Sequence, residues 1–414
     1  GLETDVPDPW AAHDAEAARR RALVDRAWET TGLHGDDLVA TLAVAADAYL
    51  VRRGESGLSV IAGYPWFADW GRDTMIALTG LTLTTGRHDE ARALLDTFLR
   101  TLRRGLIPNN FLEDGTGAGY NTVDGALWLA VALERYVAAT GDLAFAREAL
   151  PRLRELLDWH VRGTDHGIRM DPAGGLLLAG EPGVQLTWMD VKIADWVVTP
   201  RHGQPVEIQG LWLAALGAEE RLSHLLGERP HYGERLAQAQ ASFAAFLTGE
   251  FPADTLSPEG EPDPSVRPNA LIALALPDTP AAPARVEGAV RRAEAELLTS
   301  LGLHTLSPLD PRFRGNYGGD QLVRDAAYHQ GTVWPWPLGA YIDLLLGRGE
   351  VGRARATLRG LTGHVGEAGV GHVSEVFSGG SLRPGGCPFQ AWSVAELLRA
   401  HVAVARAERG VPGP

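Results

Sequence analysis

Helical segments of two kinds alternate along this chain, and the alternation limits the folds that it can adopt. The first kind is apolar almost all round, and the second is amphipathic and rich in Arg and Glu. A helix that is apolar on every side must be buried, whereas an amphipathic helix covers it with one face. We therefore predict an inner layer of helices wrapped by an outer layer. The apolar segments span 74–85, 125–133, 210–217 and 332–346, and the amphipathic segments span 88–103, 142–161, 231–248, 282–299 and 350–362.

The links between these segments alternate in length as well. Links from an apolar segment to an amphipathic one are tight, as at 85–87 and 347–349, whereas the reverse links are long and rich in Gly, Pro and Trp. Long loops without secondary structure of their own are usually functional. Because every long link leads into an inner helix, we expect all of them at one end, the mouth. These links span 105–120, 163–206, 301–331 and 366–389.

Pairing each inner helix with an outer helix gives six pairs. The last helix of the chain closes against the first one, so that the pairs complete a circle. This arrangement predicts an all-α fold, an (α/α)6 barrel with six inner and six outer helices and long loops at one mouth. The expected pairs are 74–85 with 88–103, 125–140 with 142–161, 207–226 with 231–248, 268–276 with 282–299, 332–346 with 350–362, and 390–406 with 36–52.

Composition narrows the class of function. The 414 residues include 38 Lys and Arg against 52 Asp and Glu, a net charge of −14. Such a surface repels phosphate backbones, so we expect no nucleic-acid partner. The single cysteine, Cys387, cannot form an internal disulfide, and the first residues lack the basic and apolar regions of a signal peptide. Uncharged stretches stay short of the ~18 apolar residues of a membrane span, so we expect a soluble, cytoplasmic protein without a membrane partner.

The loops assigned to the mouth are dense in polar and aromatic side chains. Indole faces stack on the apolar faces of a sugar ring, while Asp, Asn, Gln and Arg side chains bind its hydroxyls. Together the loops favour a neutral, sugar-like ligand, although packing in the core explains any single residue about as well. The Trp residues in or beside these loops are Trp66, Trp70, Trp128, Trp188, Trp196, Trp334, Trp336 and Trp392.

Glycoside hydrolysis suits these loops, because it needs two carboxyl groups on opposite sides of a glycosidic bond. One carboxyl must stay protonated as the acid, and the other must be ionised as a base or nucleophile. For Asp190, desolvation by Trp188 would raise the pKa and Lys192 would lower it, so composition alone does not choose the pair. The candidates are Asp69, Asp73, Asp124, Asp190, Asp195, Glu207, Asp320, Asp325 and Glu375.

Lys192 is the only lysine among the 38 basic residues. Where Arg prevails, a retained Lys suits a place too small for the broad guanidinium fork, although it can also survive by chance. We expect its ammonium to reach a bound sugar or a site carboxylate, directly or through water. Neither an HExxH nor a CxxC motif nor a calcium-loop pattern occurs in the sequence, so we expect no metal and no cofactor.

Several of these segments resemble the amylo-α-1,6-glucosidase domain of glycogen debranching enzymes. The matching stretches run in order from about residue 60 to about residue 400. The resemblance implies an inverting, exo-acting α-glucosidase that removes single α-1,6-linked glucose units at branch stubs of glycogen-like glucans, on an (α/α)6 barrel. The stretches are WFADWGRDTM, GLIPNN, YNTVDGALW, TWMDVK, TPRHGQPVEIQGLW, YHQGTVWPW and SEVF followed by QAWSVAELLR.

The resemblance also implies roles for matching residues. Asp190 would be the general acid and Glu375 the general base, with Asp73 and Glu207 as the next candidates. An inverting pair requires carboxyl groups ~6.5–9.5 Å apart. The resemblance places Arg72, Asp73, Trp188, Lys192, Glu207, His329 and Trp334 around the carbohydrate substrate. From the mouth loops we add Trp66, Asp69, Asn121, Asp124, Tyr328, Gln330, Trp336, Gln390 and Trp392 as expected substrate-binding residues.

The resemblance has consequences for domains. We expect residues 1–60 to form N-terminal helices that pack on the barrel, and residues 61–410 to form the glycosidase catalytic domain, together one domain. Bacterial members of the family usually carry an N-terminal, β-rich domain, which we expect to be missing from this chain. Eukaryotic members also carry a glucanotransferase barrel, and no segment here would supply that activity.

Two alternatives stay open at this point. One is a trehalase-like or other small α-glucoside hydrolase, because one barrel fold supports many chemistries. The other is a carbohydrate-binding (α/α)6 protein without catalysis. A binding module has no need of two carboxyl groups facing each other across the mouth, so the pair Asp190 and Glu375 discriminates between an enzyme and a binding protein.

Overall fold

The computed structural model of the chain describes residues 8–53, 57–111 and 117–411. In these ranges α-helices dominate, and the strands are short and lie in the loops. The expected, mainly helical class is therefore confirmed. No helix in the described ranges is long and apolar enough to cross a membrane.

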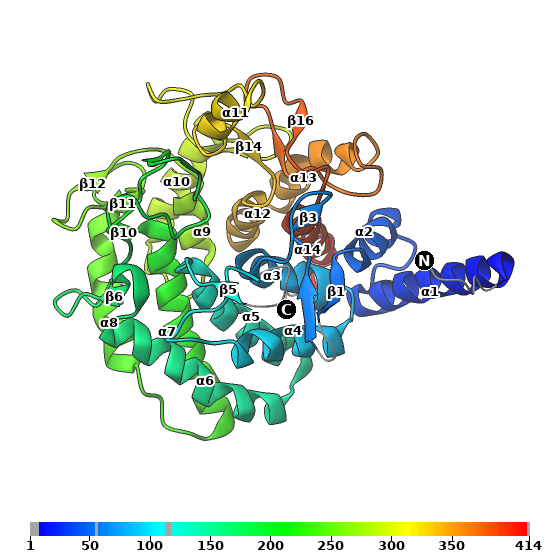
Figure 1. The fold of residues 1–414 in the computed structure, drawn as a ribbon, viewed down its shortest axis with the longest axis horizontal. Coiled ribbons are helices and arrows are strands. Elements are labelled where there is room, and N and C mark those ends of the chain that lie inside the picture. Colours follow the sequence, from blue (N-terminus) through cyan, green and yellow to red (C-terminus); the bar gives the residue numbers. More distant parts are fainter. Residues whose placement is uncertain (1–7, 54–56, 112–116, 412–414) are drawn as a thin grey trace.

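Six helices pack in series around the centre of the molecule (Figure 1). Each contacts the next, and the last contacts the first, so that within the described residues they close a ring. Their side chains are buried on nearly all sides, as an inner layer requires. In order, the ring helices are α3 (Gly71–Leu78), α5 (Asp124–Thr140), α7 (Val206–Leu226), α9 (Asn269–Ala275), α12 (Leu338–Gly347) and α14 (Ala391–Glu408).

Amphipathic helices cover this ring from outside, and each contacts one or two ring helices. The first outer helix contacts the last ring helix, which is the closing pair expected from the sequence. Tight links join the layers, as at Gly141, which ends α5 with a left-handed φ of 67° that glycine adopts without strain. The outer helices are α2 (Asp37–Asp47), α4 (His88–Arg100), α6 (Leu143–Arg162), α8 (Gly233–Ser242), α10 (Pro283–Glu296) and α13 (Val351–His364).

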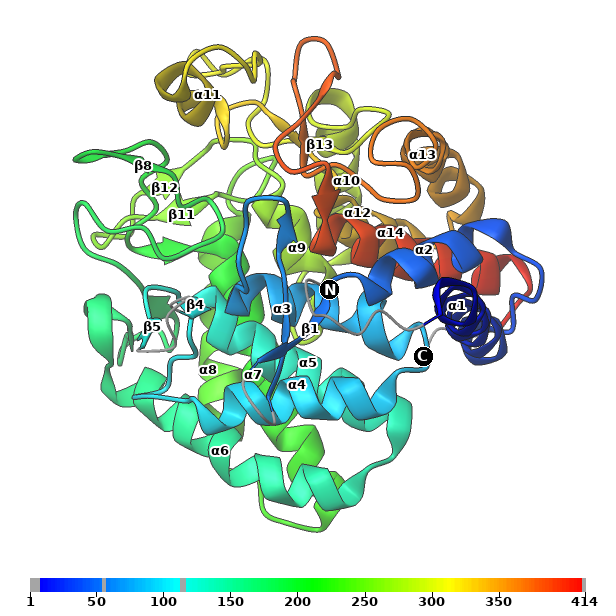
Figure 2. The same cartoon turned by 45° about the vertical axis from the view of Figure 1, so that its right-hand side comes forward.

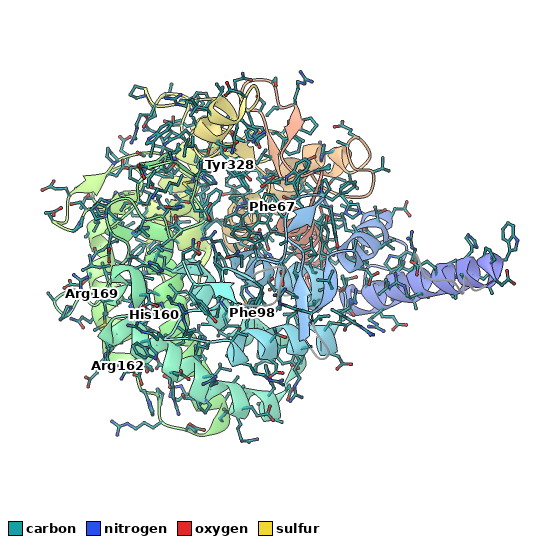
Figure 3. All side chains as sticks on the ribbon, in the orientation of Figure 1. Phe67, Phe98, His160, Arg162, Arg169 and Tyr328 are labelled. Atoms are coloured by element: carbon teal, nitrogen blue, oxygen red, sulfur yellow. The ribbon has the colours of Figure 1, made fainter. Side chains whose placement is uncertain are left out.

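Helix α1 (Pro9–Thr31) precedes the ring and packs against α2. Its N-terminal half extends away from the rest of the molecule, with side chains that stand clear of the ring (Figure 3). Trp10 near its start is 77% exposed. This helix has little amphipathic pattern, and we did not predict its bounds from the sequence.

Two predicted helices are shorter than expected because part of each segment forms a strand. The segment 36–52 is helical only to Asp47, because β1 (Leu50–Arg53) pairs in antiparallel fashion with β2 (Gly57–Val60). The segment 332–346 starts as β14 (Val333–Trp334), and α12 begins only at Leu338. Two prolines explain the delay, since a residue before proline avoids the α conformation and proline lacks the N–H that a helix interior needs.

The segment predicted as helix 74–85 begins earlier and changes pitch. Helix α3 starts at Gly71, and residues Thr79–Leu83 continue it as the π-helix η1. The backbone of η1 touches that of α14. The wider π-helical turn thus lies where the first ring helix meets the last one.

The mouth loops carry the remaining short strands. One antiparallel sheet, in the order β13, β14, β15, β16, joins the two long loops before α12 and α14. Figure 2 shows these loops with α11 (Gln321–Ala327) grouped on one side, away from α4 and α6. The strands are β3 (Gly63–Tyr64), β4 (Asn110–Phe111), β5 (Ala118–Gly119), β6 (Arg169–Met170), β7 (Leu177–Leu178), β8 (Lys192–Ile193), β9 (Trp196–Val197), β10 (Gln204–Pro205), β11 (Thr255–Leu256), β12 (Pro262–Asp263), β13 (Leu303–His304), β14, β15 (Val376–Phe377), β16 (Pro384–Gly385) and β17 (Phe389–Gln390).

Closure of the ring predicts a strong effect of Gly80→Ala. A Cβ at Gly80 would overlap the carbonyl oxygen of Ala395 in α14 and lie 2.6 Å from its Cα. Neither backbone can yield, so we expect a loss of about 2 kcal/mol or more in the free energy of unfolding, measured with denaturant. Gly352→Ala in α13 is the control, because a Cβ there meets nothing within 4 Å and alanine favours helix. Equal stability of both variants would contradict the close approach.

Candidate active site

Arg72, at the start of α3, is a buried cation that binds two carboxylates. Its Nε donates to both oxygens of Asp124, at 2.8 and 2.9 Å, and its Nη1 donates to Oδ2 of Asp190 at 2.8 Å. Asp124 begins α5, and Asp190 lies in the loop that leads to α7. The guanidinium therefore fastens the Asp190 loop to the N-terminal ends of two ring helices.

Asp190 uses only one of its two oxygens within the protein. Oδ2 accepts from Arg72, while Oδ1 has no hydrogen-bond partner among the described residues, and the side chain is 31% exposed. Burial raises the pKa of Asp190 above its ordinary value; Arg72 opposes this, and the Asp124 charge adds to it. The carboxyl therefore keeps its proton to a higher pH than an exposed aspartate does, with Oδ1 open to carry it.

Glu375 is a buried carboxyl with both oxygens engaged. Oε1 accepts from the Tyr328 hydroxyl, and Oε2 accepts from the backbone N–H of Cys387 at 2.7 Å. Burial raises the pKa of Glu375 to about 7, although both hydrogen bonds favour the charged form and lower it. Both protonation states are therefore accessible near neutral pH. Figure 3 shows Tyr328 below α11, on the side of the loops that faces the ring.

Asp73, next to Arg72, is a third carboxyl of the same site. Burial raises its pKa to about 8; Arg72 lowers it, and the charges of Asp190 and Glu375 raise it further. The hydroxyl of Tyr328 also responds to both charges, since its pKa is raised by burial and then by Glu375 and Asp190. The charges of Asp190 and Glu375, which are far apart in the sequence, therefore both raise the pKa of Asp73 and the pKa of Tyr328.

Five aromatic side chains pack beside these carboxyls, and we call them the aromatic cluster: Trp188, His329, Trp334, Trp336 and Trp392. The ring centroid of Trp188 lies 5.4 Å from that of His329, 5.5 Å from Trp334 and 5.0 Å from Trp336. Burial lowers the pKa of His329 well below its ordinary value, so its ring is neutral. Both ring nitrogens of His329 and the indole nitrogens of Trp336 and Trp392 lack partners among the described residues. Because buried polar atoms normally have partners, these atoms are suited to bind hydroxyls.

A second group of buried charges, the ionic cluster, consists of Arg201, Glu207, Asp254, Arg267 and Asn269. Arg201 binds both oxygens of Glu207, and its Nε donates to Asp254 at 2.8 Å. Asn269 donates to the other oxygen of Asp254 at 2.8 Å and accepts from the indole of Trp188 at 2.7 Å. The ionic cluster thus holds the aromatic cluster in place through the hydrogen bond between Asn269 and Trp188. Because Arg201 binds both oxygens of Glu207, this carboxyl has a structural role in the described residues.

Other predicted site residues bind neighbours in the protein. Asp69 pairs with Arg53 at 3.0 Å. Gln330 accepts from Arg267 at 2.9 Å and donates to the carbonyl oxygen of Val198 at 2.8 Å. These contacts give both side chains a structural role in the described residues.

The remaining candidates lie at the surface or at the edge of the site. Lys192 is exposed on the β8–β9 hairpin, where its ammonium donates to the Gly183 carbonyl at 2.9 Å. Its contact with a sugar stays a prediction. Trp66 is 61% exposed. Asn121, Asp195 and Asp320 are exposed, and Asp325 is half-buried. Gln390 is buried, and its Oε1 has no hydrogen-bond partner in the part of the chain that the structure describes.

Sequence reasoning named only Glu207 of the ionic cluster and missed the other four members, of which Arg201 lies in a mouth loop. Asp254, Arg267 and Asn269 belong to the loop before α9 and to the start of that helix, a segment not included among the mouth loops. Its polar, proline-rich composition was the available signal. Among the described residues, no group of three or more His, Cys, Asp or Glu side chains is arranged to hold a metal ion.

The ionic cluster predicts a large loss of stability for Asp254→Ala. The substitution leaves Arg201 and Arg267 with less compensating charge in a buried place, which costs about 3–5 kcal/mol in the free energy of unfolding. Asp96→Ala on α4 removes the partner of Arg100 at the surface and is expected to cost less than about 1 kcal/mol. Denaturant unfolding of both variants measures the difference, and similar losses would contradict the role assigned to the cluster.

Solved structures share the fold of this chain at low sequence identity. A GH63 mannosylglycerate hydrolase from Thermus thermophilus superposes with a TM-score of 0.64 at 14% identity, covering 86% of this chain and 98% of that one. A rhamnosidase from Klebsiella oxytoca gives a TM-score of 0.59 at 16% identity, covering 92% of this chain and 65% of that one. These likenesses show a fold shared with helical glycosidases.

Sequence comparison is more specific. A glycogen debranching enzyme from Saccharomyces cerevisiae is 27% identical over 387 residues, which cover 70% of this chain. The match takes in 25% of that relative, so the chain spans about a quarter of its length. The family model described as amylo-alpha-1,6-glucosidase matches residues 44–399. The resemblance seen in the sequence is thereby confirmed, and the chain belongs to the amylo-α-1,6-glucosidase family of glycoside hydrolases.

Proposed function

We propose that the chain is an inverting, exo-acting α-glucosidase that hydrolyses α-1,6-linked glucose at branch stubs of glycogen-like glucans. The observation that carries this proposal is the pair Asp190 and Glu375, which come from two different loops: Arg72, next to Asp73, binds Asp190, and the Tyr328 hydroxyl binds Glu375. Both carboxylates also raise the pKa of Asp73 and of Tyr328. Family membership supports the linkage, and the closed ring of helices with its outer layer supports assignment to the (α/α)6 barrels. A bound sugar would rest against the aromatic cluster.

Hydrogen bonding supports a division of roles between the two carboxyls. Glu375 accepts two hydrogen bonds, one on each oxygen, which suits an ionised base. Asp190 presents one free oxygen, which suits an acid that gives its proton to the departing glycosidic oxygen. Arg72 binds Oδ2 of Asp190 and thereby fixes the direction in which Oδ1 points.

In the proposed reaction the bonds change as follows. A water oxygen attacks the anomeric carbon of the terminal glucose while the bond from that carbon to the glycosidic oxygen breaks. Asp190 transfers its proton to the leaving oxygen, and Glu375 takes a proton from the attacking water. The step leaves Asp190 ionised and Glu375 protonated, and exchange with solvent restores both. Attack opposite to the leaving group turns the α-linkage into β-glucose.

The neutral His329 and the unpartnered ring nitrogens suit the recognition of sugar hydroxyls. Burial keeps the imidazole of His329 neutral, and the charges of three nearby arginines, Arg267, Arg72 and Arg201, lower its pKa further. A neutral ring offers one donor and one acceptor, the combination that a hydroxyl needs. The aromatic faces of Trp334 and Trp336 add apolar contact area.

A substrate panel with NMR detection tests the function. We expect glucose release from isomaltose and from a branched limit dextrin, with little from maltose or trehalose, and β-glucose as the first product. Initial α-glucose would contradict inversion. Preference for trehalose would favour the small α-glucoside hydrolase, and no turnover of any substrate by a folded protein would favour a binding protein.

The two carboxyl variants should differ in their dependence on the leaving group. Asp190→Asn removes proton donation, so we expect a ~10²–10⁴-fold loss on isomaltose and a much smaller loss on α-glucosyl fluoride, whose leaving group needs little assistance. Glu375→Gln removes water activation, so both substrates should suffer alike. Asp195→Asn is the matched control, because this exposed carboxyl lies on the same loop as Asp190. Unchanged activity in Asp190→Asn or in Glu375→Gln would contradict the assignment of the two roles.

The raised pKa of Glu375 predicts the pH profile of kcat/KM. As a base it must be ionised, and with a pKa of about 7 its ionised fraction rises from roughly a tenth at pH 6 to roughly nine tenths at pH 8. We therefore expect kcat/KM to rise with pH through about 7. Tyr328→Phe removes a hydrogen bond that favours the ion, so this rise should move to higher pH.

Tyr317→Phe is the control for that shift. Tyr317 stacks on Tyr328 at 5.6 Å between ring centroids, without a hydrogen bond to Glu375 among the described contacts. Its variant keeps the stack and should keep the profile of the native protein. A kcat/KM that falls through pH 7 instead of rising would make Glu375 the acid and reverse the two roles.

A further inference from the structure

A cavity of about 740 Å³ lies at the opposite end of the ring from the candidate active site. Helix α5 connects the two places, because Asp124 begins it at the active site and Arg135 lies eleven residues further on. At 1.5 Å per residue this is ~16 Å along the helix. The volume is typical of small-molecule sites, and neither the catalytic proposal nor the family match assigns a role to it.

Two arginines line this cavity without a direct contact to a carboxylate among the described residues. Arg135 on α5 and Arg406 on α14 are half-buried, and neither makes a hydrogen bond or ion pair within the described ranges. Burial lowers the pKa of the Arg135 guanidinium and the charge of Arg399 lowers it further, while the carboxylates of Glu396, Asp343 and Glu134 raise it without coming within ion-pair distance. A guanidinium that is removed from water and left unpaired is costly.

The third arginine of the cavity shows the contrast. Arg399 donates to Asp343 at 2.8 Å and to Glu396 at 2.7 Å, so its charge is compensated within the protein. No carboxylate is placed in the same way against Arg135 or Arg406 among the described side chains. Asp343 also lines the cavity but binds Arg399, so three arginines face one carboxylate there and the lining carries excess positive charge.

Thr79 supplies an independent observation in the same cavity. Its hydroxyl oxygen is buried without a hydrogen-bond partner in the described part of the chain. It begins the π-helix η1, and π-helical turns inside α-helices are frequent at functional sites. A hydroxyl and two guanidinium groups that make no hydrogen bond or ion pair with described residues thus line one cavity.

We propose that this cavity binds a small organic anion, a phosphate monoester or a carboxylate, whose charged group is held by Arg135 and Arg406. Guanidinium forks match the oxygens of both anions, and Thr79 can donate a further hydrogen bond. The apolar side chains of Leu83 and Val402 leave room for the carbon part of such a ligand. A neutral glucan lacks the charge that these residues call for, so the cavity serves a ligand different from the glycosidase substrate.

Calorimetric titration of the whole chain at constant ionic strength tests the proposal. The probes are inorganic phosphate, glycerol phosphate and citrate, with glycerol as the neutral control. We expect binding of the anions and none of glycerol, and the stronger of glycerol phosphate and citrate identifies the class of ligand. Arg135→Gln and Arg406→Gln should each weaken binding at least about tenfold.

Two controls locate the bound anion. Arg147→Gln removes an exposed charge from outer helix α6 without touching the cavity and should leave binding unchanged. Asp190→Asn leaves Arg72 with less compensating charge, so an anion held at the candidate active site would bind this variant more tightly, whereas binding in the cavity should stay unchanged. The proposal is wrong if no anion binds the folded protein, if both cavity variants bind normally, if Arg147→Gln loses binding to the same extent as they do, or if Asp190→Asn binds the anion more tightly. Because the readout is binding, it is independent of whether the glycosidase assignment holds.

Discussion

The pairing of Arg72 with Asp124 and Asp190 is the interaction on which the catalytic end depends. A guanidinium this deeply buried is stable only with its charge compensated, and the two carboxylates come from separate parts of the chain. The pairing therefore requires α3, α5 and the loop before α7 to be in place together. Without this arginine, Asp124 and Asp190 would repel each other beside Asp73. The same contacts that hold the ring helices together therefore also place Asp190 for its proposed role as the acid.

The rest of the site is built from loops, and loops need support to hold a catalytic geometry. The ionic cluster ties the starts of α7 and α9 together and positions Trp188 through Asn269. The four-stranded sheet fixes the loop that carries Glu375 against the loop before α12. Rigid helices thus set the frame, while buried charges and short strands place the reacting groups.

Much of the frame could be predicted from the sequence, because helix burial follows a local pattern. The bounds of α5 and α7 agree with the pattern to within one residue, whereas the start of α12 was wrong because its prolines were given too little weight. Partners were harder to predict. Asp69 binds Arg53 rather than its neighbour Arg72, and Arg72 binds Asp190, which is 118 residues away. Such choices depend on the three-dimensional fold, and the cavity at the far end, with no motif of its own, could not be predicted from the sequence at all.

The bond from the Cys387 main chain to Glu375 has a consequence for how this loop can vary. Its donor is a backbone N–H, so every amino acid except proline supplies it, and the sulfur of Cys387 contributes nothing to this bond. The preceding residue is under the opposite constraint: a Cβ at Gly386 would overlap the same carboxylate oxygen. The two adjacent positions therefore tolerate substitution very differently. Position 387 accepts any residue except proline that fits the space around it, whereas position 386 accepts only glycine.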